Sequence, residues 1–162
     1  MKAEVRFIRA FLYFRLSNLY GDIPFFLGDI TLEESKNMTR TPRAQVISTL
    51  HSELDEIIPL LPKREDLKAG EQGRITKAAA VMLKARMYLY DGQMDKVKTE
   101  CDKLINQQGT YGAYSLFTTS TGTGEQYYSA YENLFTSAYE YNQEVILDYA
   151  AVPQVKEWQM ID

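Results

Sequence analysis

The sequence predicts a mostly α-helical protein built from tetratricopeptide-like antiparallel helix pairs, followed by an irregular tail that contains short strands. Apolar residues recur at intervals of three and four along three stretches, 3–20, 41–62 and 76–105, which is typical of helices with one apolar face. Glycine and proline residues separate these stretches, and the periodicity weakens after residue 110. We therefore expect a helical part over residues 1–110 and an irregular, tyrosine-rich segment over residues 111–162.

The first predicted helix covers residues 3–20, and its apolar surface is wide enough to predict a central position. One stripe, widened by three phenylalanines, consists of Val5, Ile8, Leu12, Leu16 and Leu19 with Phe7, Phe11 and Phe14. Arg6 and Arg9 lie on consecutive turns of one side. They either reach water over apolar neighbours or pair with carboxylates from a later segment. Gly21-Asp22 ends the helix, because glycine tolerates the conformation that terminates one.

The second helix is predicted to start at Thr41-Pro42, with threonine as the cap and proline in the first turn. Residues 31–40, which precede it, are polar and predict a surface loop. The apolar positions of this helix form the clearest stripe in the chain, made of Val46, Ile47, Leu50, Leu54, Ile57, Ile58 and Leu61. Leu61-Pro62 ends it, since the residue before a proline avoids the helical conformation.

Residues 76–105 predict two helices folded back on each other. Thr76 can cap the first helix through its hydroxyl, and Asp91-Gly92 marks the turn between the two. The apolar stripe of the second helix consists of Met94, Val97, Cys101, Leu104 and Ile105. Gly109 is expected to close the unit.

The spacing inside this hairpin is compatible with a tetratricopeptide repeat. Such a repeat has a small residue and an aromatic residue in its first helix, and here these positions hold Ala85 and Tyr88. The core positions of its second helix hold Val97, Cys101 and Leu104. An ordinary helical hairpin gives much of the same pattern, so spacing alone leaves both interpretations open. In either case one pair cannot bury its own apolar faces and needs neighbours.

Beyond residue 110 the pattern predicts mostly irregular structure. Residues 111–118 alternate loosely and can be extended, and residues 119–125 have the composition of a loop. A short helical turn is expected within residues 127–135. The run EVILDY at residues 144–149 predicts a short strand.

Four stretches match, in order, the motifs of one known family. They are AEVRFIRAFLYFRLSNLYGDIPF at residues 3–25, TPRAQVISTLHSELDEIIPLLP at 41–62, GRITKAAAVMLKARMYLYDGQMDKVKTECDKLI at 73–105, and the late pair YENLF at 131–135 and EVILDY. In their order and spacing the chain resembles the SusD/RagB family, the glycan-capturing outer-membrane lipoproteins of Bacteroidetes. Family members are longer and begin with a signal peptide and a lipid-bearing cysteine. The resemblance therefore implies an internal piece that reaches the start of the family's variable half.

The resemblance also implies a function. It is the non-catalytic binding of an oligosaccharide or related nutrient at the bacterial cell surface, for uptake through a partner SusC-like TonB-dependent transporter in the outer membrane. Attachment to the membrane would then depend on a lipid anchor that this chain does not contain. The alternative is a helical-repeat scaffold that binds another protein and no glycan, since stacked helix pairs commonly present such surfaces.

Sugar binding needs flat aromatic faces for the ring and polar groups for the hydroxyls. In the tyrosine-rich segment we predict ligand contacts from Trp158, Tyr127 and Tyr128 as platforms and from Asn133 as a hydrogen-bonding residue. The competing interpretation is that these tyrosines pack against the helices with their hydroxyl groups at the surface. The position of the exposed aromatic side chains distinguishes the two.

The composition favours binding over catalysis and disfavours several other functions. His51 is the only histidine and borders an apolar stripe, and the adjacent carboxylates of Asp55 and Glu56 point in different directions on a helix. One Cys and one His leave no zinc cluster, so neither a metal nor another cofactor is expected. The net charge of −4, without a basic stripe, argues against nucleic acid as a partner. No apolar run reaches the roughly 20 residues that span a bilayer.

Overall fold

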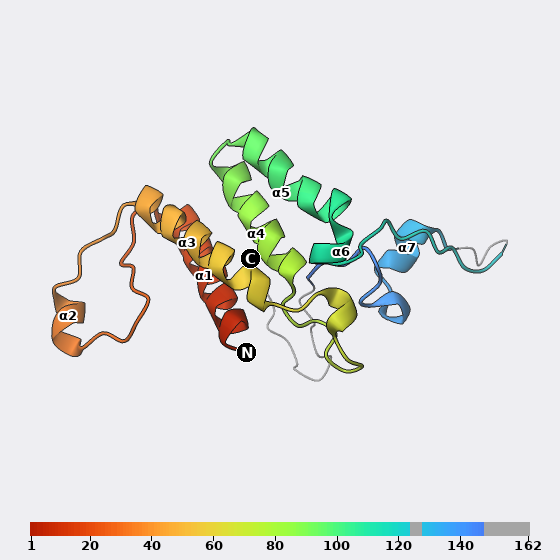
Figure 1. Ribbon diagram of the computed structural model, residues 1–162, viewed down its shortest axis with the longest axis horizontal. Helices are drawn as coiled ribbons and strands as arrows, with labels where there is room; N and C mark the ends of the chain where they lie inside the picture. Colours follow the sequence, from red (N-terminus) through yellow and green to blue (C-terminus); the bar gives the residue numbers. More distant parts are fainter. Residues whose placement is uncertain (124–127, 148–162) are drawn as a thin grey trace. The chain divides into compact units, whose positions relative to one another are not determined.

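The computed structural model describes residues 1–123 and 128–147, and it confirms a mostly α-helical chain with antiparallel helix pairs (Figure 1). The chain divides into two compact units. The first unit contains residues 1–66 and 75–113, and the second contains residues 67–74 together with the chain from residue 114 onward. In the described ranges the β-structure is limited to two isolated bridges, Ile23↔Thr41 and Thr121↔Tyr128.

The first helix pair of unit 1 consists of α1 (Lys2–Tyr20) and α3 (Arg43–Ile57), which lie side by side and antiparallel (Figure 1). The guanidinium of Arg43 at the start of α3 donates to the Asn18 side chain near the end of α1, at 2.9 Å. The connection contains α2 (Leu32–Lys36), one short helix in the predicted surface loop. Thr31 and Glu34 close a capping box there, which explains why a polar segment forms a helical turn.

The apolar stripe predicted for α1 is only partly buried. Phe7 and Phe14, which were expected to widen it, are buried, but Val5, Ile8, Leu12, Leu16 and Leu19 are all exposed in the structure. The buried face instead consists of Ala3, Phe7, Ala10, Phe14 and Ser17, spaced alternately four and three residues apart. Small residues alternate with phenylalanine on this face, so the backbone of α1 can approach its neighbours closely. Because α1 is apolar on most sides, counting apolar residues favoured the wrong side.

Helix α3 buries the stripe that the sequence predicted, with Val46, Leu50 and Ile57 fully inaccessible to solvent. It continues into a 3₁₀ turn, η1 (Ile58–Leu60), at the proline in the last turn. The predicted Thr41 cap is wrong, because the Thr41 backbone instead pairs with Ile23 at 2.8 and 3.3 Å. The Asp22 carboxylate accepts from the Arg43 backbone N–H at 2.8 Å and therefore caps the start of α3.

The second pair consists of α4 (Lys77–Tyr90) and α5 (Met94–Asn106), joined by a turn in which Gly92 has a φ of 69°. The predicted Thr76 cap is confirmed, since its hydroxyl accepts from Ala79 N–H at 3.3 Å. Helix α4 contacts both α3 and α5 and buries most of its surface, as predicted. Two other polar turns lie nearby in the sequence, η2 (Arg64–Asp66) and α6 (Gln108–Tyr111).

The stripe predicted for α5 is only partly buried. Leu104 is buried, Val97 and Cys101 are half-buried, and Met94 and Ile105 are exposed. Gly109 does not close the hairpin, because α5 already ends at Asn106 and Gly109 lies inside α6.

Unit 2 is largely irregular and contains α7 (Ala130–Leu134) and the 3₁₀ turn η4 (Ser137–Tyr139). The short helix agrees with the turn expected in residues 127–135. The strand predicted at 144–149 is wrong where it can be compared, because residues 144–147 form turns and bends, and the last two residues lie outside the described ranges. Gly73 has a φ of 88°, in the left-handed region that favours glycine, and a Cβ at this position would lie 3.2 Å from the Tyr141 ring.

Candidate functional site

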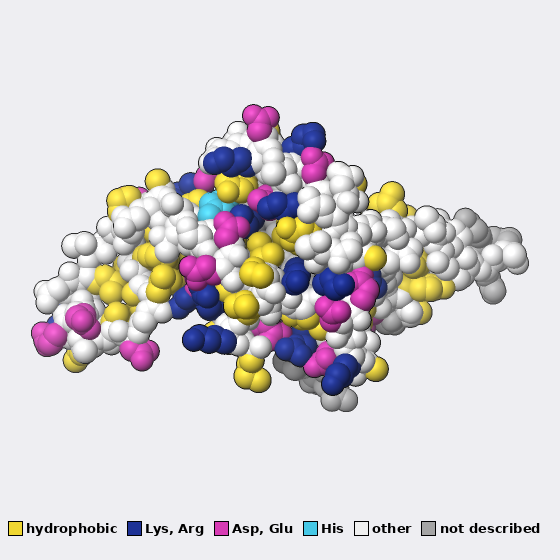
Figure 2. Space-filling view, in the orientation of Figure 1, with side chains coloured by type: hydrophobic (Ala, Val, Ile, Leu, Met, Phe, Trp, Pro, Cys, Tyr) yellow, Lys and Arg dark blue, Asp and Glu magenta, His cyan; other side chains and the backbone are white. Residues whose placement is uncertain are grey.

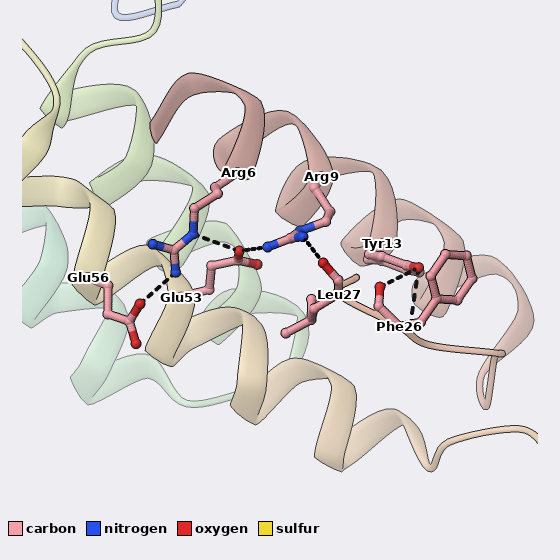
Figure 3. A network of polar contacts seen from close by, with 7 residues as sticks. All are labelled: Arg6, Arg9, Tyr13, Phe26, Leu27, Glu53 and Glu56. Carbon is pink, nitrogen blue, oxygen red and sulfur yellow. Dashed lines mark hydrogen bonds and ion pairs between the residues drawn. The ribbon is translucent and has the colours of Figure 1, made fainter. Parts of the chain in front are cut away.

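Two charged residues of α1 are paired with carboxylates of α3 (Figure 3). Arg6 donates to Glu53 Oε1 at 2.9 Å and to Glu56 Oε2 at 2.6 Å. Arg9 donates to the same Glu53 oxygen and to the backbone carbonyl of Leu27. Hydrogen bonds to Glu56 and Glu53 raise the pKa of Arg6, although burial opposes the shift. Of the two alternatives that the sequence left open for these arginines, pairing with a later segment is therefore correct.

The loop that follows α1 is held against the same helix. The Tyr13 hydroxyl donates to the Phe26 carbonyl at 3.0 Å, and the Tyr13 ring meets the Phe25 ring edge to face at 4.8 Å. Leu27 and the helices α1 and α3 line an open groove of ≈ 700 Å³. Side chains of both charge signs line this groove, including Lys2, Arg6, Arg9, Glu53 and Glu56.

His51 packs against an aromatic ring at the edge of the core. Its ring stacks on Tyr88 with centroids 4.0 Å apart, and neither ring nitrogen has a hydrogen-bond partner among the described residues. Burial, together with the nearby charge of Lys84, lowers the pKa of His51 to about 4. The imidazole is therefore neutral near pH 7 and acts as a packing residue at the edge of the core, which agrees with its predicted boundary position.

The carboxylates of Asp55 and Glu56 point in different directions, as expected for adjacent helical residues. Asp55 pairs with Lys84 of α4, whereas Glu56 pairs with Arg6 of α1. The two groups therefore do not face one substrate bond. Among the described residues, no group of His, Cys, Asp and Glu side chains is arranged to hold a metal ion.

Unit 2 presents a patch of exposed aromatic side chains at α7, formed by Tyr131 and Phe135, and Tyr128 is exposed just before this helix in the sequence. Tyr131 is 73% exposed and Phe135 is 72% exposed, and their rings meet edge to face at 5.2 Å. Tyr131 lies in the first turn of α7 and Phe135 is its C-cap, four positions later, so the two side chains share a face. Such a surface can stack against the apolar face of a flat or ring-shaped ligand.

A capping box explains why a five-residue helix forms at this place. The Ser129 hydroxyl accepts from Glu132 N–H, and the Glu132 carboxylate accepts from the backbone N–H and the hydroxyl of Ser129. These backbone and side-chain hydrogen bonds lower the pKa of Glu132. Sequence reasoning missed Phe135, although the Ser-x-x-Glu pattern was the signal that places Tyr131 and Phe135 on one helical face.

The structure describes two of the four predicted ligand-binding residues. Tyr128 is exposed, and its backbone pairs with Thr121 at 2.8 and 3.0 Å. Asn133 is buried, and its amide donates to the Thr119 carbonyl at 3.0 Å and to the Thr121 hydroxyl at 3.1 Å. Asn133 therefore ties the preceding loop to α7. Tyr127 and Trp158 lie outside the described residues, and a ligand role for all four stays a prediction.

The surface shows mixed charge. On the face drawn in Figure 2, the described basic and acidic side chains lie interspersed over the helices. This agrees with the excess of only four acidic residues in the whole chain. Among the described residues, none of the helices combines the length and hydropathy that crossing a bilayer requires.

Comparisons with a family model and with known protein sequences both match this chain to SusD-like proteins. A SusD-like family model, described as starch-binding and associating with the outer membrane, matches residues 1–89. The chain is 29% identical over 154 residues to SusD-like protein P25 of Formosa agariphila, covering 91% of this chain and 25% of that protein. It is 33% identical over 109 residues to the starch-binding protein SusD of Bacteroides thetaiotaomicron, covering 61% and 17% of the two chains.

The fold of the chain also matches solved structures of SusD-like proteins. A SusD-like protein from Bacteroides fragilis matches with a TM-score of 0.75 and 26% identity over 93% of this chain and 27% of its own. A SusD-like carbohydrate-binding protein from the same species matches with a TM-score of 0.66 and 26% identity, over 72% and 22% of the two chains. The chain thus spans between 17% and 27% of the length of these relatives.

Proposed function

The chain belongs to the SusD-like family, and we propose that it is part of a non-catalytic protein that binds an oligosaccharide at the bacterial cell surface. The match of residues 1–89 to a family described as starch-binding carries this proposal. The names of two relatives, a starch-binding protein and a carbohydrate-binding protein, support it. In this proposal residues 1–110 form the helical support and residues 111–162 begin the part that recognises the glycan.

The proposed glycan contacts centre on the aromatic patch of α7. Tyr131 and Phe135 are exposed and would present ring faces to the sugar. The platforms predicted from the sequence, Tyr127, Tyr128 and Trp158, would contribute further ring faces. Asn133 would act mainly by holding the loop of Thr119 and Thr121 in place, because its amide already donates to both. This arrangement supports the interpretation in which exposed aromatic side chains on an irregular surface favour sugar over peptide.

Uptake and location are further parts of the proposal. The bound oligosaccharide would pass to a SusC-like TonB-dependent transporter, and the whole protein would be attached to the outer membrane through a lipid anchor. The family's description as associating with the outer membrane supports this location. A pull-down from Bacteroides membranes with the tagged chain as bait should recover a TonB-dependent transporter, and recovery of none would contradict the partner assignment.

Affinity electrophoresis tests the glycan proposal directly. We expect the chain to be retarded by at least one glycan in a panel of amylopectin, laminarin and xyloglucan, and Tyr131→Ala together with Phe135→Ala should abolish the retardation. Tyr20→Ala is the matched control, because Tyr20 is similarly exposed but lies on α1. Trp158→Ala tests the predicted platform beyond the described residues. Absence of retardation by every glycan would contradict the proposal.

The exposed side of α1 favours a second candidate function, a scaffold that binds another protein. Val5, Leu12 and Leu19 lie exposed along one side of this helix. If Leu12→Glu abolishes recovery of a partner protein while no glycan retards the chain, the scaffold replaces glycan binding as the function. If glycans retard the chain and Leu12→Glu has no effect on partner recovery, the scaffold is excluded.

A further inference from the structure

The outer side of α1 carries an apolar stripe that the described part of the chain leaves uncovered. It lies on the opposite side of the helix from the buried residues Ala10 and Phe14, and each of its members is between 39% and 73% exposed. The stripe consists of Val5, Ile8, Leu12, Leu16 and Leu19. A contiguous apolar surface on a water-exposed helix marks an interaction surface.

The spacing of this stripe fits a second helix. Its members follow one another at intervals of three, four, four and three residues, with a mean of 3.5. This mean is the repeat of the seam between two helices that pack along their length. The occupant that fits the stripe is therefore a helix with the same repeat.

The intervals are the same from either end of the stripe. A twofold axis through Leu12 would set Val5 of one copy against Leu19 of a second copy. The same axis would set Ile8 against Leu16. An interface between two identical chains needs this self-complementarity, because one surface patch has to meet itself. Helix α1 thus supplies both sides of an antiparallel helix pair.

The charges near the ends of α1 are complementary in the same antiparallel arrangement. The helix dipole favours a cation near the C-terminal end, but the last turn of α1 contains no basic residue. Lys2 lies in the first turn, where the positive end of its own helix repels it. The axis through Leu12 would bring Lys2 to the C-terminal end of the second copy's α1, level with Asp22. A parallel pair would instead set the two lysines side by side.

The area of the stripe predicts a weak association. An unfolded chain exposes roughly 1.45 Å² per dalton, so the five partly exposed residues present about 450 Å² in each copy. Two copies would then bury about 900 Å² from the stripes alone. This is close to the lower limit of roughly 1,000 Å² for a specific interface.

We infer that two copies of this chain form a twofold-symmetric dimer through the outer side of α1, with Leu12 on the axis. The small area predicts a dissociation constant on the order of 10–100 µM, so the chain is mostly monomeric at low micromolar concentrations. The dimer goes beyond the proposed function, because it requires neither a glycan nor the residues of α7.

Sedimentation equilibrium of the whole chain between about 5 and 500 µM tests the dimer. We expect the average mass to rise from 18.7 kDa toward twice that value. Leu12→Glu should weaken the association at least about tenfold, because the axis would bring two carboxylates together. Leu60→Glu is the matched control, since Leu60 is 69% exposed but lies on η1, and it should associate like the wild type.

A mixture of Leu12→Glu and Leu12→Lys tests the position of the axis. Each variant alone should stay monomeric, whereas the mixture should associate, because a carboxylate then meets an ammonium group. Circular dichroism checks that both variants fold, which we expect because Leu12 is exposed.

Four results would overturn the inference. They are a monomer at every concentration, a dimer that Leu12→Glu leaves unchanged, a dimer that Leu60→Glu also abolishes, and a mixture that does not associate. If the wild type stays monomeric while Leu12→Glu abolishes recovery of a partner protein, the occupant of the stripe is that protein and not a second copy. Leu12→Glu should leave retardation by glycans unchanged, so the dimer and the proposed function can fail separately.

Discussion

Buried charges in unit 1 are held by carboxylates on neighbouring helices. Burial alone would lower the pKa of Lys84, but its hydrogen bond to Asp55 and the charge of Glu100 outweigh this effect and raise the pKa. Glu100 lies 3.5 Å from Lys84 and also pairs with Lys103 at 2.6 Å. Removing one member of such a group leaves a buried charge without an opposite charge beside it, which strongly destabilises the folded state. These ion pairs therefore link α3 to α4 and α4 to α5.

His51 should make the stability of the fold sensitive to mild acid. Its folded-state pKa of about 4 lies below the ordinary value of 6.5, so the unfolded chain binds the proton first as the pH falls. The contribution of the neutral ring is complete above pH 6.5 and is lost as the pH falls toward 4. His51→Phe, which keeps a ring against Tyr88, should reduce this loss by about 1 kcal/mol, allowing for partial exposure.

Urea unfolding of both proteins at a series of pH values measures the difference. Other groups titrate in both proteins and cancel in the comparison. Parallel stability curves for the wild type and His51→Phe between pH 6.5 and 4 would contradict the buried neutral state.

The cap of α3 gives a second residue-level prediction. Asp22→Ala should lower the free energy of unfolding by about 1 kcal/mol, because the Asp22 carboxylate accepts from the first backbone N–H of α3. Thr41→Ala should have little effect, since Thr41 pairs through its backbone and its side chain does not cap the helix. Chemical denaturation of the two variants measures both values, and a larger loss for Thr41→Ala would restore the cap that the sequence predicted.

At the scale of elements, periodicity predicted the helices but not always the side that each helix buries. Helix α3 has one apolar stripe, so its buried face was predictable. Helix α1 has apolar residues on most sides, and the deciding feature was the placement of Ala3, Ala10 and Ser17, seven residues apart, where another helix can approach. In EVILDY the apolar run was too short to distinguish a strand from a turn, since no partner strand was visible in the sequence.

The two sides of α1 should respond differently to substitution. Ala10 is completely buried, so Ala10→Leu should overpack the core and reduce the free energy of unfolding by about 1–3 kcal/mol. Leu12 is 56% exposed, and Leu12→Ser should change it by no more than about 0.5 kcal/mol. Thermal denaturation of the pair checks this assignment. A greater loss for Leu12→Ser would mean that the stripe predicted from the sequence is the one that packs.

At the scale of the whole molecule, the ordered motifs indicated the family, but the candidate site was only partly predictable. The tyrosine-rich composition pointed to the segment that contains the proposed glycan contacts, and Tyr128 is exposed there. Composition did not separate Asn133, which is buried and holds a loop, from Phe135, which is exposed beside Tyr131. The groove beside the Arg9–Glu53 ion pair was not predicted either, because these two residues are 44 positions apart in sequence and only the packing of α1 on α3 brings them together.

The distribution of buried residues predicts unequal local stability in the two units. The largest fully buried side chains lie on α1, α3 and α4, including Leu50, Leu54, Ile57 and Met87. In unit 2, Asn133 alone is buried among the residues whose burial the structure describes. Regions with few buried contacts open locally at a lower free energy than the core does. Hydrogen exchange should therefore be slowest in α3 and α4, and faster by at least about tenfold in residues 114–123 and 128–147.

Mass spectrometry of peptides from a single exchange time course measures both regions in the same sample. Addition of a glycan that retards the chain should slow exchange around α7 and leave α3 and α4 unchanged, because ligand binding stabilises the region that contacts the ligand. Equal exchange in the two units without glycan would mean that unit 2 has a core of its own. The tyrosine-rich segment would then be rigid before it binds, which would contradict a recognition surface supported mainly by the helix pairs.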